Sequence, residues 1–347
     1  MANPEIKFAN TEDKIKWDSF IEENNGTIFQ TFGWKEVIEK TFGYKPYYLY
    51  AEDNGIKAVL PCFFVKSRLF GNKLISVPCG GDAAGPLGEI PASKTLVNKL
   101  VELGTKLKIS QIEIHNIKQE HIPDGSGFIK PWDYFSFILN LSKSSDAIFK
   151  DFHKHLRNGI RKAEKNKVEI KEIKSEQDLK IFYKIYQRSM HVLGTPPLPF
   201  NFFENIFEII GPKVKFYLAE YKNKPIVGGI FILEKERVRW LIGSNLAEYR
   251  HLNSNSLMLW ECIKWAVVNN CKYFDFGGSR PNSGNFEFKK RFGVEIISRD
   301  WRYKFFNKSE ITDPRTEKFQ TYSRIWKKLP LPLCNLVGPY IRKSMGR

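Results

Sequence analysis

Apolar and polar positions alternate along this chain in a way that predicts a similar succession of helices and strands twice. In the first half, two helices lead to two strands joined at Asn54-Gly55, a dipeptide typical of tight hairpin turns. A further strand, an amphipathic helix and a last strand follow. These elements are predicted at residues 12–24, 32–40, 46–51, 57–65, 74–77, 96–107 and 111–115. Such a mixture is typical of an α/β protein with mixed sheets.

The second half repeats this pattern, although the two halves share no recognisable sequence. Its helices are predicted at residues 146–166, 176–190, 201–210 and 257–268, and its strands at residues 216–221, 225–233, 238–243, 273–276 and 301–306. The helix at 257–268 is apolar on nearly every side, so it is expected to be buried. We predict one domain at residues 1–140, a second at residues 141–310, and a tail at residues 311–347.

The segment 273–293, YFDFGGSRPNSGNFEFKKRFG, is the most informative part of the chain. A buried strand is expected to end at the glycine pair that begins at Gly277, and a polar loop then leads to a short helical turn. Phe288 and Phe292 are spaced i, i+4, so they share one face of that turn and can pack on a sheet. Lys289 is then a single cation beside an apolar anchor, at the carboxyl end of a strand, where ligands bind in α/β sheets. The alternative is an ordinary strand, loop and helix with a solvated lysine.

A second cluster lies in the basic segment HKHLRNGIRKA, residues 153–163. On a continuous helix, Lys150, Lys154, Arg157 and Arg161 would be spaced so that all four lie on one face. This stripe is either a solvated face or a binding site for phosphate groups. Arg157 and Arg161 are the first candidates for phosphate contacts, because a guanidinium group binds phosphate in a bidentate manner.

Three segments that occur in this order resemble the FemAB-like branch of the GNAT acetyltransferase-fold superfamily. They are the Gly-Ser loop with the FKxxFG turn inside 273–293, the basic segment at 153–163, and MHVLGTPPLPFNFF at 190–203. The resemblance covers the chain from about residue 15 to about residue 306. It implies two tandem GNAT-like acyltransferase domains, and an enzyme that forms an amide bond on a cell-envelope precursor of peptidoglycan or of an exopolysaccharide.

Carried over to this chain, the resemblance implies that Lys289 is the catalytic residue. Lys289 would stabilise the charge that develops when an acceptor amine attacks an acyl ester. The resemblance also implies substrate contacts by Arg157, Arg161, Gly194, Thr195, Ser279, Arg280, Phe288 and Glu89. Glu89 ends a Gly-Pro loop that usually presents an aspartate to the acceptor in this family, and Asp82 is the other acid nearby. Asp275 is expected to order the glycine loop by hydrogen bonds.

One turn of the chain, which differs from the GNAT pattern, indicates which donor supplies the acyl group. GNAT enzymes normally bind the pyrophosphate of acyl-CoA at an R-x-x-G-x-G/A turn, where glycine lets backbone N–H groups approach the phosphates. The corresponding stretch, Arg250 to Asn255, reads RHLNSN and has no glycine. The FemAB-like family typically uses aminoacyl-tRNA, so this is the expected donor, with no bound cofactor. An acyl-CoA-dependent N-acyltransferase is the alternative, and a non-catalytic protein that binds RNA or membranes is a third.

The charge balance favours anionic partners. The chain has 55 Lys and Arg against 38 Asp and Glu, a formal net charge of +17, which suits nucleic acid, lipid headgroups or phosphorylated substrates. The five cysteines form no C-x-x-C pair, which argues against a disulfide framework and a zinc site. His153 and His155 would point apart on a helix, so no metal site is predicted there. Without an apolar leader at its start, the chain is expected to be cytoplasmic.

The tail has a pattern of its own. From Arg315 to Arg347 it has eight Lys and Arg and one acid, and prolines at 330, 332 and 339 interrupt its apolar stretch. A membrane-spanning helix is therefore not expected. A segment that is basic, aromatic and rich in leucine either lies in a membrane interface or packs on the preceding domain. The first alternative would place the protein at the inner face of the membrane and would suit a lipid-linked acceptor.

Overall fold

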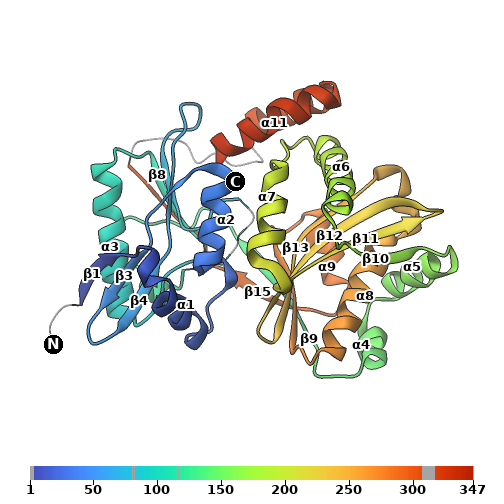
Figure 1. The fold of residues 1–347 in the computed structure, drawn as a ribbon, viewed down its shortest axis with the longest axis horizontal. Helices are drawn as coiled ribbons and strands as arrows, with labels where there is room; N and C mark the ends of the chain where they lie inside the picture. The colour runs from blue at the N-terminus through green and yellow to red at the C-terminus, as the bar shows by residue number, and fades with distance from the viewer. Residues whose placement is uncertain (1–3, 80, 82, 116, 307–316, 347) are drawn as a thin grey trace. The chain divides into compact units, whose positions relative to one another are not determined.

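The computed structural model describes residues 4–79, 81, 83–115, 117–306 and 317–346 (Figure 1). The chain divides into two compact units. The first comprises Met1–Asp133, Arg299–Thr312 and Tyr340–Arg347, and the second comprises Tyr134–Ser298 and Asp313–Pro339. Each unit combines helices with sheets, so the predicted α/β class is confirmed.

The predicted domains, at residues 1–140 and 141–310, are contiguous stretches of sequence. Each of the two units, by contrast, combines separate segments of the chain. Strand β16 (Arg302–Phe305) pairs with β8 (Gln111–Ile114) inside the first unit. Strand β9 (Tyr134–Asn140), which the sequence pattern does not reveal, pairs with β14 (Tyr273–Ser279) inside the second. The boundary therefore follows hydrogen-bonded pairing between strands that are distant in sequence.

Two sheets form the framework of the first unit. Their strand orders are β1-β3-β4-β7 and β16-β8-β6-β5-β2. The strands not yet given are β1 (Glu5–Phe8), β2 (Lys45–Pro46), β3 (Leu49–Glu52), β4 (Ile56–Leu60), β5 (Phe63–Val65), β6 (Lys73–Ile75) and β7 (Leu87–Gly88). Asn54-Gly55 turns β3 into β4, as predicted, with both residues at positive φ. The single strand expected at 57–65 is divided at Pro61, because proline cannot donate a hydrogen bond to a sheet ladder.

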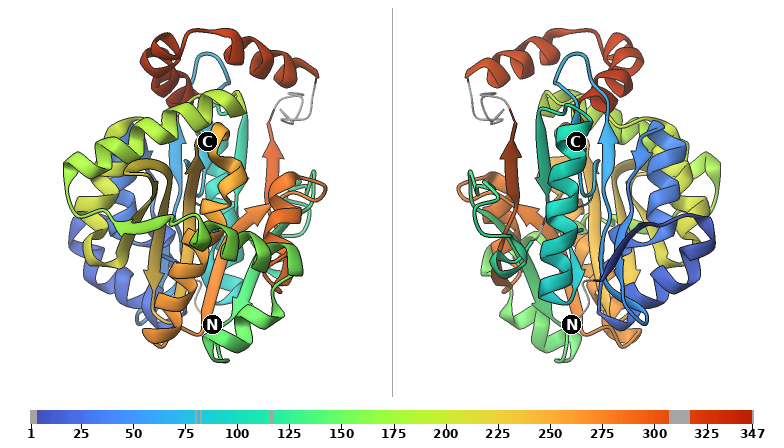
Figure 2. Two further views of the ribbon diagram at one scale, coloured as in Figure 1. Left: turned by 90° about the vertical axis from the view of Figure 1, so that its right-hand side faces the viewer. Right: turned by 90° about the vertical axis from the view of Figure 1, so that its left-hand side faces the viewer.

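Helix α3 (Ile90–Lys106) closes the core of the first unit. It runs beside the strands of this unit and packs against β3 and β4 (Figure 2). Its buried face includes Leu96, Val97 and Leu100, which join the apolar side chains of the sheets in one cluster. The helices α1 (Lys14–Glu23) and α2 (Phe32–Phe42) add large aromatic side chains to the interior of this unit.

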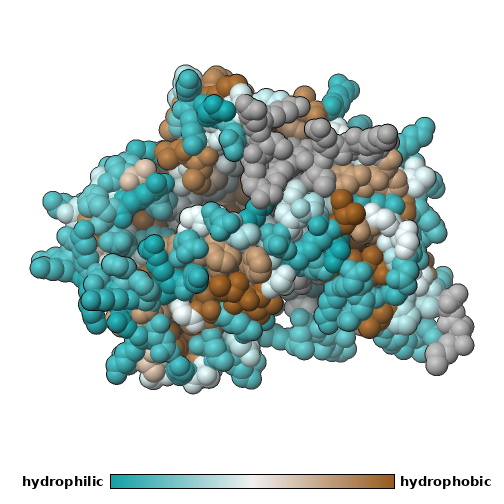
Figure 3. Space-filling model, turned by 180° about the vertical axis from the view of Figure 1, so that it is seen from behind, coloured by the Kyte–Doolittle hydropathy of each residue, from teal (hydrophilic) through white to brown (hydrophobic). Residues whose placement is uncertain are grey.

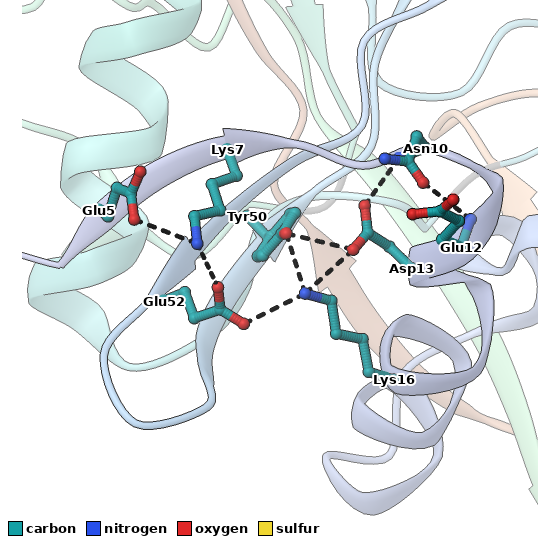
Figure 4. Close-up of polar contacts among 8 residues, drawn as sticks. All are labelled: Glu5, Lys7, Asn10, Glu12, Asp13, Lys16, Tyr50 and Glu52. Carbon is teal, nitrogen blue, oxygen red and sulfur yellow. Dashed lines mark hydrogen bonds and ion pairs between the residues drawn. The ribbon is translucent and has the colours of Figure 1, made fainter.

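A polar network lies on the surface of the first unit, where β1, β3 and α1 meet (Figure 4). The ammonium group of Lys7 lies 2.7 Å from the Glu52 carboxylate. The ammonium group of Lys16 lies 3.2 Å from Glu52 and 3.0 Å from Asp13. It also donates to the Tyr50 hydroxyl at 2.9 Å. The network therefore ties the first strand and the first helix to β3.

A seven-stranded mixed sheet forms the framework of the second unit. Its strand order is β10-β11-β12-β13-β14-β9-β15. The remaining strands are β10 (Glu169–Glu172), β11 (Val214–Tyr221), β12 (Lys224–Glu234), β13 (Arg237–Asn245) and β15 (Glu295–Arg299). The helices are α4 (Ser145–Asp151), α5 (Lys154–Lys165), α6 (Glu176–Leu193), α7 (Phe200–Asn205), α8 (Ser254–Val268), α9 (Gly284–Lys290), α10 (Glu317–Lys328) and the first part of α11 (Leu331–Met345).

Helices α6 and α8 cover opposite faces of this sheet. A Cβ atom on Gly228 would lie 2.4 Å from the ring of Phe182 in α6, and one on Gly229 would lie 2.6 Å from Met258 in α8. Successive residues of a strand face opposite sides. The two glycines of β12 therefore let one helix approach closely on each side, and most of α8 is buried, as its apolar sequence predicts.

Candidate active site

The site is built where two parallel strands of the second unit part. Strands β13 and β14 pair over only three residues, from Arg237 opposite Tyr273 to Arg239 opposite Asp275. Beyond this point β13 stays with β12 as far as Asn245, whereas β14 pairs with β9. The carboxyl ends of the two strands are therefore not hydrogen-bonded to each other. In α/β sheets, ligands bind outside the carboxyl ends of strands.

Lys289 lies at this divergence and contacts all three strands that border it. Its ammonium group donates to the carbonyl oxygen of Gly278, in β14, at 3.0 Å. It also lies 5.5 Å from the ring centre of Phe137, in β9, and 5.8 Å from that of Trp240, in β13. The residue is only 6% exposed. Lys289 is therefore not a solvated lysine. It is a buried cation between two aromatic rings.

The sequence predicts that strand β14 ends at the glycine pair, but the strand continues to Ser279. Gly277 has φ of +71°, which L side chains rarely adopt, and the pairing with β9 shifts register between Asp275 and Gly278 and then resumes. The chain thus forms a bulge instead of leaving the sheet. Asp275 orders this bulge, as expected, because its carboxylate accepts a hydrogen bond of 2.8 Å from the Gly277 N–H.

Arg239 is a buried residue of the site region that the sequence analysis does not identify. Its side chain lies 3.0 Å from the Asp275 carboxylate and 3.1 Å from the Glu234 carboxylate. Arg239 and Asp275 are both almost completely buried. The contacts run from Arg239 through Asp275 to the bulge, and from the bulge through Gly278 to Lys289. An arginine between the apolar residues Val238 and Trp240 of a strand is the sequence signal that could have identified it.

The loop after β14 supports the helix that carries Lys289. The Ser279 hydroxyl is buried and donates to the Gly278 carbonyl at 2.8 Å. The carbonyl oxygen of Arg280 accepts from the Ser283 hydroxyl at 2.9 Å, and the Ser283 oxygen caps the start of α9. Ser279 and Arg280, both predicted substrate contacts, therefore lie next to the carbonyl that holds Lys289.

The two phenylalanines of the turn pack as their spacing predicts. The ring centres of Phe288 and Phe292 are 5.5 Å apart, and the ring of Phe292 lies 4.6 Å from that of Phe276 in β14. Phe292 also contacts Phe152, with ring centres 5.2 Å apart. The turn after α9 is thereby attached both to the sheet and to the segment that joins α4 and α5.

The basic segment is not the continuous helix that the sequence predicts. Helix α4 ends at Asp151 and α5 begins at Lys154, because Phe152 and His153 have extended backbone angles. Phe152 is buried against Trp260 and Phe292, which accounts for the break. The helical spacing from Lys150 to Lys154 is therefore lost.

The guanidinium groups of the basic segment lie near α4. Arg157 donates to the carbonyl oxygen of Lys150, and the guanidinium of Arg161 lies 5.5 Å from the ring centre of Phe149. Arg161 is exposed and Arg157 is half-buried. Two of the four cations predicted for one face therefore approach the preceding helix.

His153 and His155 are expected to point apart, but their rings lie close together. Their ring centres lie 5.2 Å apart, because His153 precedes α5 and caps it by accepting from the N–H of His155. The helical spacing argument does not apply to a residue outside the helix. Among the described residues, no group of three or more His, Cys, Asp or Glu side chains is placed to hold a metal ion.

Gly194 and Thr195, predicted substrate contacts, form the end of α6. Gly194 has the left-handed conformation of a helix C-cap, and the N–H groups of both residues donate to carbonyl groups of the last turn. A Cβ atom on Gly194 would lie 2.1 Å from the Ser323 hydroxyl of α10. The glycine thus has a packing role in the described structure.

Glu89 belongs to the first unit. It precedes α3, its backbone N–H donates to the Lys57 carbonyl, and its carboxylate lies 3.6 Å from the Lys57 ammonium. Its side chain is largely exposed. The other acid considered for the acceptor, Asp82, lies outside the described residues.

The turn that binds acyl-CoA in GNAT enzymes is a short 3₁₀ helix here, Ala247–Leu252, followed by Asn253. Asn253 has φ of +57°, a left-handed conformation that asparagine tolerates better than most residues. It precedes α8, but its side chain makes no capping hydrogen bond. The hydroxyl of Ser254 is buried without a hydrogen-bond partner among the described residues.

Comparisons with known proteins agree with this geometry. Residues 150–290, which include α5, the divergence of β13 and β14, and Lys289, match the family model of the acetyltransferase (GNAT) domain. A search of curated proteins gave no match.

Solved structures resemble the chain over most of its length. FemX is 14% identical with a TM-score of 0.65, covering 93% of this chain and 100% of its own. The L-PGS of Bacillus licheniformis is 9% identical with a TM-score of 0.58, covering 93% of this chain and 99% of its own. The C-terminal domain of a protein described as a lysylphosphatidylglycerol synthetase, from Agrobacterium fabrum, is 13% identical with a TM-score of 0.56, covering 85% and 93%.

At these identities the structures establish the fold, and the family match establishes the type of domain. The predicted tandem arrangement of GNAT-like domains and the predicted acyltransferase class are both confirmed. The chain is an acyltransferase with a GNAT-type domain at residues 150–290 and with the fold of FemX over nearly its whole length.

Proposed function

We propose that this acyltransferase moves an aminoacyl group from a charged tRNA to an amine of a cell-envelope precursor. The precursor would be a phosphorylated or lipid-linked intermediate of peptidoglycan or of an exopolysaccharide. The observation that carries the proposal is Lys289, a buried cation where β13 and β14 part. Two of the structural neighbours add support. One is named FemX, and the other is described as a lysylphosphatidylglycerol synthetase, a name that denotes an aminoacylated lipid as product.

The proposed reaction is a direct transfer. The acceptor amine attacks the carbonyl carbon of the aminoacyl ester, the new C–N bond forms, and the C–O bond to the tRNA ribose breaks. The amine loses one proton and the ribose oxygen gains one. An ester is already activated, so the enzyme mainly supplies positioning and charge stabilisation. Lys289 stabilises the oxyanion of the tetrahedral intermediate, or the leaving oxygen, because a fixed cation acts strongly in a site with little water.

Cations on α5 are the proposed contacts of the tRNA backbone. Arg157 and Arg161 carry permanent charges, and Arg161 is exposed. A chain of net charge +17 also attracts a polyanion from a distance. The remaining substrate contacts that we propose are Gly194, Thr195, Ser279, Arg280, Phe288 and Glu89.

Three observations favour acyl-CoA as the donor instead. The family model that matches residues 150–290 is that of an acetyltransferase domain. Asn253 also takes the left-handed conformation before α8, and the Ser254 hydroxyl is buried there without a hydrogen-bond partner among the described residues. Asn253 carries a side chain where the GNAT pattern has glycine. A side chain there hinders the close approach of a pyrophosphate to the backbone, which is why aminoacyl-tRNA is the preferred donor.

Transfer from labelled aminoacyl-tRNA and from labelled acetyl-CoA, measured side by side with envelope precursors, tests the proposal. Wild-type protein should transfer label from aminoacyl-tRNA, and Lys289→Met should lower kcat by about 10²–10³-fold, as the loss of one oxyanion donor does in other enzymes. Lys290→Met is the matched control, because Lys290 is an exposed cation on the same helix. The pair Arg157→Gln and Arg161→Gln should raise KM for the charged tRNA.

The outcomes separate the donor from the mechanism. Transfer from acetyl-CoA alone would establish the alternative and make the Arg250 turn the donor site. Full turnover in a folded Lys289→Met variant would exclude the role assigned to this residue. Loss of activity in both lysine variants would indicate that surface charge on α9 matters rather than the buried cation.

A further inference from the structure

The tail of the chain forms two helices with a buried side and an exposed side. Trp326 of α10 and Cys334 of α11 are buried. The imidazole of His191, at the end of α6, lies 2.9 Å from the carbonyl oxygen of Leu329, which joins the two helices. A Cβ atom on Gly338 would lie 2.4 Å from Pro197, so α11 also approaches the turn after α6 closely. The described part of the tail as far as Pro339 is therefore attached to the rest of the second unit along one side.

Both helices also expose large apolar side chains. Tyr322 and Ile325 of α10 are spaced i, i+3, as are Leu333 and Leu336 of α11, so each pair lies on one helical face. Ile325 is 53% exposed and Leu336 is 68% exposed. Figure 3 shows apolar side chains beside polar ones along the upper edge of the molecule, the region of the red helix α11 in Figure 1. We call these four residues the tail face.

Positive charge without negative charge accompanies the tail face. Residues 319–339, which belong to the second unit together with the tail face, contain the exposed cations Arg324, Lys327 and Lys328 and no aspartate or glutamate. No acid of the described residues forms an ion pair with Lys327 or Lys328. The boundary of a bilayer with acidic headgroups has an apolar interior and an anionic surface. Exposed apolar side chains next to cations are complementary to both parts of this boundary.

We propose that the tail face docks this protein on an anionic membrane surface, with Tyr322, Ile325, Leu333 and Leu336 entering the interface and the neighbouring cations on the headgroups. The tail lies on the membrane and does not cross it, since no helix in the described part of the chain is long and apolar enough to span a bilayer. A contact with RNA would use the cations but not the exposed Ile and Leu side chains. The proposal does not depend on the acyl donor or acceptor.

Flotation of the full-length protein with vesicles tests the docking. The protein should float with phosphatidylcholine vesicles that contain phosphatidylglycerol and should float far less with phosphatidylcholine alone. The double variant Ile325→Ser with Leu336→Ser should lower the vesicle affinity at least tenfold, because it removes two apolar side chains from the interface. Val268→Ser is the matched control, since Val268 is an exposed apolar residue at the end of α8.

A second variant separates the electrostatic part. Lys327→Gln with Lys328→Gln should weaken binding to anionic vesicles and should make the remaining binding less sensitive to salt. Thermal melts of every variant confirm that the fold is retained. Equal flotation of wild type and the Ile325 and Leu336 variant would overturn the proposal. So would a self-associated wild type that the same variant converts to monomer without a change in vesicle affinity, because the face would then be a contact between copies.

Discussion

At the scale of single residues, we expect the buried ion pair of Arg239 and Asp275 to contribute to the stability of the fold. Asp275→Asn should lower the free energy of unfolding by about 3 kcal/mol, because removal of one partner leaves a buried charge poorly compensated. Asp275 also holds the bulge at Gly277, so the substitution disturbs the carbonyl that contacts Lys289. Urea titration followed by tryptophan fluorescence measures the loss.

A matched control uses an exposed ion pair of the same unit. Glu236→Gln removes the partner of Lys272, at 2.7 Å, where both side chains are more than half exposed. The expected loss is within about 1 kcal/mol, as for other surface pairs. A similar loss for Asp275→Asn would mean that the buried pair contributes no more than a surface one.

The sequence identifies Lys289 but not Arg239, and the reason is physical. Lys289 belongs to a local pattern in which glycines, aromatic spacing and a lone cation lie within one short segment. The partner of Arg239 lies 36 residues further along the chain, in β14, and only the three-residue pairing of β13 with β14 brings the two together. A contact that depends on strand register is not visible in local patterns of apolar and polar positions.

At the scale of helices, the packing of α10 on the end of α6 makes the second prediction. Gly194→Ala should loosen α10, because the added Cβ atom would lie 2.1 Å from the hydroxyl and 2.8 Å from the carbonyl oxygen of Ser323. A left-handed alanine adds about 1–2 kcal/mol of strain. Faster hydrogen exchange of the α10 amides in the variant than in the wild type is the expected result.

Gly43→Ala is the control for backbone strain. Gly43 also caps a helix in the left-handed conformation, at φ of +66°, but a Cβ atom there would meet no atom within 4 Å. Gly43→Ala should add the same backbone strain in the first unit and leave the hydrogen exchange of the α10 amides unchanged. Unchanged exchange in Gly194→Ala as well would show that α10 is not held by this contact.

The break between α4 and α5 is not visible in the sequence. Apolar spacing alone favours one helix over 146–166, because no glycine or proline interrupts the segment before Gly159. The break at Phe152 arises from its packing against Trp260 and Phe292, which come from later parts of the chain. Tertiary contacts outweigh local helix propensity there. The long buried helix α8, by contrast, is visible in the sequence because nearly all of its positions are apolar.

At the scale of the whole molecule, the order of elements is predictable and the partition into units is not. The sequence predicts a mixed α/β chain with a repeated pattern, and the structure has it. The return of β16 to the first unit is decided by its pairing with β8, about 190 residues earlier, which no pattern in either segment specifies.

Net charge and acid stability belong to the same scale and make the last prediction. Hydrogen bonds from Lys7 and then from Lys16 lower the pKa of Glu52. For Asp13, burial alone would raise the pKa, but hydrogen bonds from the Asn10 N–H and from Lys16 outweigh it and lower the pKa. Carboxylates with a lowered pKa stabilise the fold above their unfolded pKa of about 4, and the contribution is lost as the pH falls through the folded pKa. Hydrogen bonds of the same polar network raise the pKa values of Lys7 and Lys16. The stability that these two ammonium groups contribute is therefore lost only at high pH, as the pH rises through their folded pKa values.

The Tm of Glu52→Gln should therefore lie below that of the wild type by a constant amount between about pH 5 and pH 9, and the difference should shrink below about pH 4. The difference is the informative quantity, because a chain of charge +17 gains further positive charge in acid and loses stability through self-repulsion in both proteins. Glu102→Gln, which removes an exposed partner of Lys99, should change Tm little at any pH. A Tm difference for Glu52→Gln that stays the same at pH 3 as at pH 7 would mean that the network holds β1 and α1 on β3 by packing, and that its charges contribute nothing to the fold.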